Sequence, residues 1–187
     1  MSSKKSTSAI ADSIKKRKIP NDVFITPVLL AKKQINMIEV VEGDVWFDPF
    51  KATGNFFNQF PNTGVEHIWG EITEGRDFLT QNVKCDVICS NPPYSLLDKV
   101  FRRCIELNPK VVSFLIGVGN LTTRRIEMME KANYSITKLH MCKIFQWYGM
   151  SYIVQFEKST EPCMTYDRII WRDENPNTKY VWEKKAK

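Results

Sequence analysis

Cys85-Asp86-Val87-Ile88-Cys89-Ser90-Asn91-Pro92-Pro93-Tyr94 is the stretch of the sequence that decides the fold. Its first six residues form a short apolar run of the kind that makes a fully buried parallel strand. The chain then leaves the sheet at the carboxyl end of that strand, which is the edge where open α/β sheets bind their ligands. We therefore expect residues 91–94 to form a loop at a ligand site.

Two consecutive prolines stiffen this loop, because they fix φ, remove two backbone donors and push the preceding residue into an extended conformation. The polar groups that remain are mostly acceptors, namely the side-chain oxygen of Asn91 and the backbone carbonyls. Two such acceptors can hold both hydrogens of an NH2 group while the ring of Tyr94 stacks on its face. The loop therefore suits a planar group that carries an amine. The alternative interpretation is an ordinary proline-stiffened loop with a tyrosine that only packs.

The length and composition indicate one ordinary domain. A chain of 187 residues with 43% hydrophobic residues can bury a full core. No stretch approaches the roughly 18 apolar residues of a membrane span, and the N-terminus lacks the apolar segment of a secretory signal. Five cysteines without CxxC spacing and two distant histidines argue against a metal site. Reduced thiols in a reducing compartment inside the cell fit this pattern best.

The charge balance favours a polyanionic partner, since the net charge is +6 and the pI is near 9.0. Lysine and serine dominate residues 1–19, which we expect to form a disordered basic arm. Such an arm could follow phosphates or serve as a nuclear address, and a solvated tail is an equally good interpretation. Residues 20–187 are expected to form the single folded domain, without a large target-recognition domain.

Periodicity along the chain predicts strands that alternate with helices. The expected strands are 45–48, 65–69, 85–90, 110–116, 136–145 and 151–156. The expected helices are 28–35, 96–107 and 123–132. This alternation predicts an α/β fold with a mostly parallel sheet and helices on both faces. Residues 146–149 join the last two strands in a hairpin-like connection, so this pair should form an antiparallel edge.

The order of these motifs resembles the Rossmann-like, class I, S-adenosylmethionine-dependent amino-methyltransferases. It is most similar to the adenine-N6 DNA methyltransferases of the small phage and virus type, from about Phe24 to Lys158. Four pieces carry the resemblance: Thr26-Pro27 before the first helix, Asp48-Pro49-Phe50 with Gly54 after the first strand, Glu71 after the second strand, and Asn91-Pro92-Pro93-Tyr94 after the fourth. One piece departs from the family pattern, because residues 48–54 replace a shorter run that usually contains two glycines.

The resemblance implies S-adenosylmethionine as the cofactor. Asp48 would face its cationic amino-acid end, Gly54 would let the backbone approach closely, and Glu71 would accept both ribose hydroxyls. Asp77 and Phe78 would hold the adenine, by a hydrogen bond from its amine and by ring packing. The segment from Phe24 to Pro27 would close over the methionine end. The implied cofactor-binding set is Phe24, Thr26, Pro27, Asp48, Pro49, Phe50, Gly54, Glu71, Asp77, Phe78 and Asn91, and no metal is expected.

The resemblance also implies a catalytic loop made of Asn91, Pro92, Pro93 and Tyr94. Hydrogen bonds from the target NH2 to the Asn91 side chain and the Pro92 carbonyl would draw negative charge onto the nitrogen and stabilise the charge that develops during transfer. The target adenine would be flipped out of the DNA. The expected substrate-binding residues are Tyr94, with Phe145 or Trp147 to stack on the extruded base, and Lys51 and Arg124 on phosphates.

Three other functions use the same sequence features. RNA adenine methyltransferases and protein glutamine methyltransferases carry similar loops, and a methyltransferase-like subunit could bind nucleic acid without catalysis. The basic arm and the aromatic hairpin favour nucleic acid over protein, while DNA over RNA rests on the resemblance. No long insertion is present to recognise a target sequence. We therefore expect a homo-oligomer or a separate specificity subunit as the partner, and no membrane association.

Overall fold

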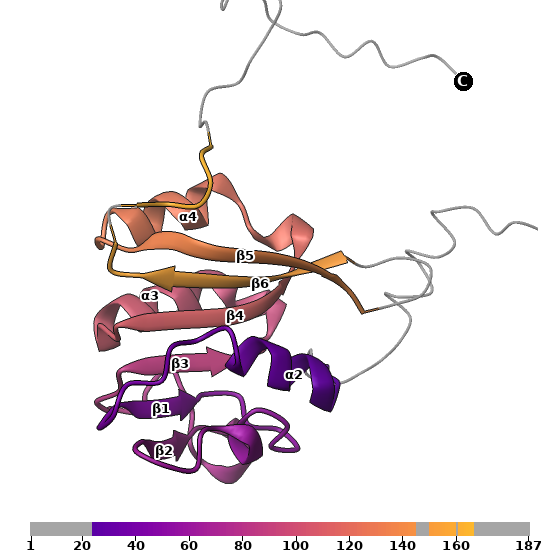
Figure 1. Ribbon diagram of the computed structural model, residues 1–187, viewed down its shortest axis with the longest axis vertical. Coiled ribbons are helices and arrows are strands. Elements are labelled where there is room, and N and C mark those ends of the chain that lie inside the picture. The colour runs from indigo at the N-terminus through magenta and orange to yellow at the C-terminus, as the bar shows by residue number, and fades with distance from the viewer. Residues whose placement is uncertain (1–23, 145–149, 160, 167–187) are drawn as a thin grey trace, which may run out of the picture.

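The computed structural model describes residues 24–144, 150–159 and 161–166. Six strands form one sheet in the order β2-β1-β3-β4-β6-β5 (Figure 1). The first four pair in parallel, and β6 pairs antiparallel with both β4 and β5. The predicted α/β architecture with an antiparallel C-terminal edge is therefore confirmed.

The elements lie within a few residues of their predicted bounds. The strands are β1 (Val45–Asp48), β2 (Glu66–Trp69), β3 (Val87–Ser90), β4 (Val111–Gly117), β5 (Ser135–Lys143) and β6 (Met150–Glu157). The helices are α2 (Val28–Ile35), α3 (Leu97–Leu107) and α4 (Thr123–Glu130). Helix α4 ends earlier than expected because the chain turns at Asn133, which has a φ of 65°.

The helices cover both faces of the sheet, as the strand pattern predicted. Helix α2 buries Ala31 and Ile35 against Trp46, Val87 and Cys89 on one face. Helices α3 and α4 lie on the other face (Figure 1), where their apolar residues join the larger core cluster. In α3 the buried residues recur at helical spacing, which is why this segment packs as a helix: Leu97, Val100, Phe101 and Cys104.

The Asn91 loop follows the third strand of the chain rather than the fourth. The segment between β2 and β3 turns instead of pairing with the sheet, because the Asp77 carbonyl accepts the backbone N–H groups of Thr80 and Gln81. The Asp77 carboxylate also accepts the N–H of Leu79 at 3.0 Å. All six predicted strands form, so only the place given to the loop in the strand order was wrong, and the loop lies at the expected edge of the sheet.

Among the described residues, no helix is long and apolar enough to cross a membrane.

Candidate functional site

The carboxyl ends of three parallel strands bring the predicted residues to one edge of the sheet. Asp48 ends β1, Glu71 follows β2 and Asn91 follows β3. A cavity of about 140 Å³ opens between the three loops. It is lined by Pro49, Phe50, Ala52, Glu71, Ile72, Thr73, Asp77, Phe78, Leu79, Asn91, Pro93, Leu96 and Val100.

The inner part of this cavity is apolar and shaped by aromatic rings. Phe78 is 2% exposed, and its ring centroid lies 5.8 Å from that of Phe47 and 5.3 Å from that of Phe50. Asp77 lines the same wall. A carboxylate beside packed aromatic and aliphatic side chains can accept a hydrogen bond from a flat heterocycle and bury its faces.

Glu71 holds the loop after β1 in place. One carboxylate oxygen accepts the Ala52 N–H at 2.9 Å, and the other accepts the N–H and hydroxyl of Thr73 at 3.2 and 2.9 Å. Partial burial raises the pKa of Glu71, but the hydrogen bonds from Thr73 and Ala52 and the charge of Lys51 outweigh it and hold that pKa below its ordinary value. Glu71 is therefore an ionised acceptor at neutral pH on the cavity wall.

Asn91 lies where this cavity meets a second, smaller one. The smaller cavity is lined by Asn91 and by residues of two segments, Phe24–Thr26 and Phe50–Phe56. The Asn91 Nδ2 donates to the Phe24 carbonyl at 3.2 Å, which fixes the amide orientation. Its Oδ1 is buried and has no hydrogen-bond partner. A buried acceptor without a donor is costly, so this oxygen is suited to a donor that a ligand brings.

The turn after β1 uses two residues with positive φ. Gly54 has a φ of 82°, and an added Cβ would lie 2.7 Å from the Asn58 Nδ2. Ala52 has a φ of 43°, although this conformation is unfavourable for a residue with a Cβ. Ala52 thus takes a conformation that glycine adopts more easily. Gly54 lines neither cavity, so its close contact is with Asn58 rather than with a ligand site.

Asp48 is fully buried beneath the cavity and lines neither pocket. Its Oδ1 accepts the Ser90 hydroxyl at 2.6 Å and the Phe50 N–H at 3.3 Å, and its Oδ2 accepts the Phe57 N–H at 3.2 Å. Burial raises the pKa of Asp48 to about 6 despite these three donors. The structure shows its hydrogen bonds to the loops, whereas its contact with a cofactor stays a prediction.

This raised pKa predicts that Asp48 makes stability depend on pH. A carboxyl whose pKa is higher in the folded than in the unfolded protein stabilises the fold when protonated, and this stability is lost as pH rises from about 4 to about 6. Relative to Asp48→Asn, the wild-type free energy of unfolding should fall by about 2 kcal/mol between pH 4 and pH 7. Urea unfolding at both pH values checks this. If the difference in free energy of unfolding between wild type and Asp48→Asn stays constant with pH, the burial argument is contradicted.

The remaining predicted residues are only partly brought together. Thr26 is buried, its carbonyl accepts the Asn55 Nδ2, and Pro27 begins α2 by accepting the Leu30 and Ala31 N–H groups. Tyr94 lies beside the end of β4, so a Cβ on Gly117 would be 3.4 Å from its ring.

Both basic residues expected to contact phosphates lie near acidic side chains. The Lys51 Nζ lies 3.9 Å from the centroid of the Trp69 ring and 3.5 Å from a Glu74 carboxylate oxygen. Arg124 is exposed on α4, with its guanidinium 4.0 Å from Asp98. Phe145 and Trp147 lie outside the described residues.

Six residues of the cavity wall were missed by sequence reasoning: Ala52, Ile72, Thr73, Leu79, Leu96 and Val100. Glu71 followed two residues later by Thr73 is a local capping pattern that could have indicated the turn. The other five carry no chemical signal. No group of three or more His, Cys, Asp or Glu side chains able to hold a metal ion occurs in the described part of the chain.

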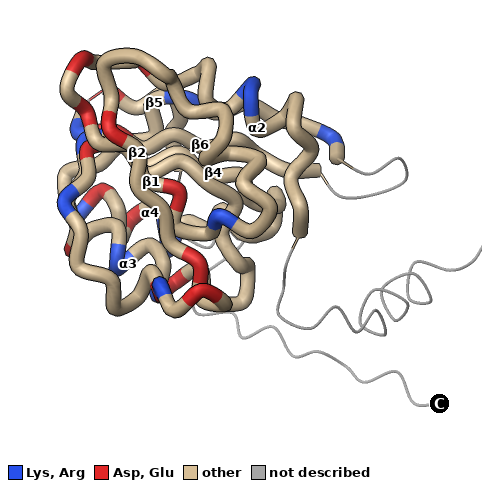
Figure 2. The backbone as a smooth tube through the Cα atoms, turned by 90° about the horizontal axis from the view of Figure 1, so that it is seen from below, with Lys and Arg blue, Asp and Glu red and all other residues tan. Residues whose placement is uncertain are grey.

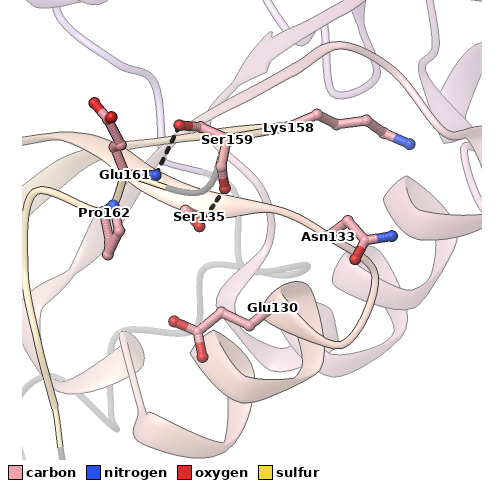
Figure 3. A pocket seen from close by; sticks show the side chains of 7 residues that line it. All are labelled: Glu130, Asn133, Ser135, Lys158, Ser159, Glu161 and Pro162. Atoms are coloured by element: carbon pink, nitrogen blue, oxygen red, sulfur yellow. Dashed lines mark hydrogen bonds between the residues drawn. The ribbon is translucent and has the colours of Figure 1, made fainter.

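A larger, open cavity lies at the opposite edge of the sheet and contains none of these residues. It is formed by the end of α4, the start of β5 and the segment after β6 (Figure 3). Ser135 donates to the Ser159 carbonyl there, and the Glu161 N–H donates to the Ser159 hydroxyl. Because these polar groups already bind one another, the cavity presents no convergent, unpaired site.

Comparison with known proteins identifies the fold. No protein-family model matches the sequence, and a search of curated proteins gives no match. Solved structures do match the fold. TrmN from Thermus thermophilus superposes with a TM-score of 0.52 at 17% identity, covering 76% of this chain and 53% of that chain. A precorrin-6y C5,15-methyltransferase from Geobacter metallireducens GS-15 gives 0.51 at 15% identity, covering 72% and 90%.

A third match is a modification subunit of a putative type I restriction enzyme from Vibrio vulnificus YJ016. Its TM-score is 0.52 at 13% identity, covering 81% of this chain and 48% of that chain. This chain therefore spans about half the length of TrmN and of the modification subunit. The three matches identify a Rossmann-like class I methyltransferase fold. At these identities the likeness concerns the fold alone.

Proposed function

We propose that this chain is an S-adenosylmethionine-dependent methyltransferase that methylates the exocyclic amine of adenine in DNA. The observation that carries the proposal is the buried, unpaired Oδ1 of Asn91, at the junction of two cavities on the carboxyl edge of a class I methyltransferase sheet. An acceptor in that position suits an NH2 donor that is brought by the substrate.

The cavity lined by Glu71 and Asp77 would take the nucleoside part of the cofactor. Glu71 is an ionised acceptor for ribose hydroxyls, and Asp77 beside Phe78 offers an acceptor and an apolar wall for adenine. The smaller cavity, between the Phe24–Thr26 segment and the loop after β1, would take the methionine end. Asn91 lines both cavities, so the methyl group would lie next to its amide. When bound, the cofactor supplies an electrophilic methyl group on a sulfonium.

The chain's own residues prepare the target nitrogen. The Asn91 oxygen and the Pro92 carbonyl would accept the two amine hydrogens, and Tyr94 would stack on the base. These bonds place electron density on nitrogen and stabilise its positive charge as the N–CH3 bond forms and the S–CH3 bond breaks. The bonding electrons stay on sulfur, and the amine proton leaves to water afterwards. Most of the remaining acceleration comes from fixing two reactants in line.

Nucleic acid as the substrate is supported by the charge on the α2 side of the site. Lys32 and Lys33 are exposed on α2, and the tube in Figure 2 shows blue for basic residues but no red for acidic residues along this helix. Strand β5 lies beside it, since the Lys138 ammonium donates to the Met37 carbonyl just after α2. Lys143 adds a further exposed charge near the end of β5. Basic side chains on this side can neutralise phosphates next to the target base.

The choice of DNA over RNA as the substrate rests on the resemblance of the Asn91 loop and its neighbouring motifs to those of adenine-N6 DNA methyltransferases. RNA adenine and protein glutamine remain the alternative acceptors. An inactive nucleic-acid-binding subunit is a fourth candidate, favoured by the glycine-poor turn after β1. Against it, Ala52 reaches the positive φ that this turn requires. We also propose a single domain that gains sequence specificity from a second copy or a separate subunit.

The test is a transfer assay with labelled S-adenosylmethionine and separate pools of duplex DNA, single-stranded DNA, RNA and denatured protein. Digestion to nucleosides and mass spectrometry then locate the methyl group. N6-methyladenine in DNA is the expected product. Label in RNA or in glutamine would show that this acceptor, rather than DNA, is the substrate. Cofactor binding without transfer to any pool would support a missing subunit, and no cofactor binding at all would support the inactive subunit.

A further inference from the structure

Asp48 and Ser90 form a buried pair at the point where two loops of the site leave the sheet. Both side chains are 0% exposed, and the Ser90 hydroxyl donates to the Asp48 Oδ1 at 2.6 Å. Asp48 is the last residue of β1 and Ser90 the last residue of β3, and the two strands are neighbours in the sheet. Neither residue lines either of the two cavities at this edge of the sheet.

Asp48 is also hydrogen-bonded to the turn that follows it, and Ser90 is hydrogen-bonded to a side chain of helix α2. Asp48 accepts the N–H groups of Phe50 and Phe57, which bracket the turn after β1. The Ser90 carbonyl accepts the Nε2 of Gln34, a buried side chain of α2, at 3.3 Å. The next residue after Ser90 is Asn91. The pair thus forms a buried connection between the turn that shapes both cavities and the amide that would bind the target amine.

We propose that Asp48 and Ser90 are positioning residues that couple the turn after β1 to the Asn91 loop, so that cofactor binding and placement of the amine acceptor depend on each other. The inference rests on the proposed function, because it assigns a linkage within that same site. When Asp48 is ionised it accepts all three donors at once. A protonated carboxyl accepts these bonds more weakly and its own O–H needs an acceptor, which would loosen the turn or the bond from Ser90.

The groups around Asp48 make this contact sensitive to pH. Glu71, from the loop after β2, disfavours the Asp48 charge, and Cys89 on β3 is a neutral thiol because burial raises its pKa well above the ordinary value. Gln34 on the α2 side carries no charge. The bond from the Ser90 hydroxyl lowers the pKa of Asp48, so removing that hydroxyl should raise this pKa further.

The test compares Ser90→Ala with Ser113→Ala in cofactor binding by calorimetry across pH 5–9. Ser113 is a matched control, since it is a buried serine on the neighbouring strand β4 and pairs in register with Cys89. Ser90→Ala should weaken S-adenosylmethionine binding on the order of tenfold at pH 8, although the residue touches no cofactor. The pH at which binding is lost on acidification should also move upward, and Ser113→Ala should shift neither quantity.

A second variant keeps the test decisive if Ser90→Ala does not fold. Ser90→Cys keeps a donor at this position, although the thiol donates only weakly, so it should show an intermediate loss and a smaller shift in pH. If the Ser90 variants bind the cofactor as the wild type and Ser113→Ala do, with the same pH dependence, the inference is overturned and the proposed function stands. If the wild-type protein does not bind the cofactor, both are overturned together.

Discussion

Replacing Asn91 by alanine should lower the rate of methyl transfer by about 10²- to 10³-fold, the usual cost of removing one donor or acceptor that stabilises a transition state. The loss should appear in the chemical step, because the Asn91 Oδ1 is the unpaired acceptor of the site and is expected to bind the amine hydrogen. Single-turnover measurements with saturating cofactor check this. The dissociation constant of the cofactor should change by only a few fold.

Asn55→Ala is the matched control for this variant. Both asparagines anchor the same segment, since the Asn91 Nδ2 donates to the Phe24 carbonyl and the Asn55 Nδ2 donates to the Thr26 carbonyl. If Asn91 acted only as an anchor, the two variants would lose similar activity. We expect Asn55→Ala to lose less than about tenfold, the cost of one hydrogen bond. Equal losses of activity in both variants would show that Asn91 takes no part in the chemical step.

The sequence predicted the parts of the fold that depend on local pattern. The apolar run before Asn91, the predicted helix 96–107 and the predicted strands 136–145 and 151–156 all formed the expected elements. Position at the carboxyl edge then followed from the rule for parallel sheets, and it brought Glu71, Asp77 and Asn91 to one cavity as the motif order implied.

The interactions that sequence reasoning did not reach are those between residues far apart in the chain. The contact of Asp48 with a cofactor stays a prediction, whereas its hydrogen bonds with Ser90, 42 positions later, and with two backbone N–H groups were not predicted. The Glu71 contact with the Ala52 N–H spans 19 positions. No local signal distinguishes a carboxylate that holds a loop from one that binds a ligand, because both require the same residue type at the same strand end.

Glu71→Ala should weaken S-adenosylmethionine binding by about 10²-fold. Two losses combine: the acceptor for the ribose hydroxyls disappears, and the Ala52 N–H loses its partner in a turn that already holds Ala52 at an unfavourable φ. Glu71→Gln keeps one acceptor oxygen and should lose less. Isothermal titration calorimetry measures both variants. Glu74→Gln is the control, because Glu74 belongs to the same turn but pairs with Lys51.

A cofactor analogue that lacks the ribose 2′-hydroxyl separates the two contributions. If Glu71 binds the hydroxyls, the analogue should bind the wild type more weakly than S-adenosylmethionine does, and Glu71→Ala should no longer discriminate between the two ligands. If Glu71 acts only by holding the turn, the variant should weaken both ligands by the same factor. That second outcome would place Glu71 beside Asp48 as a residue that shapes the loop after β1, and it would leave ribose recognition to other residues of the cavity wall.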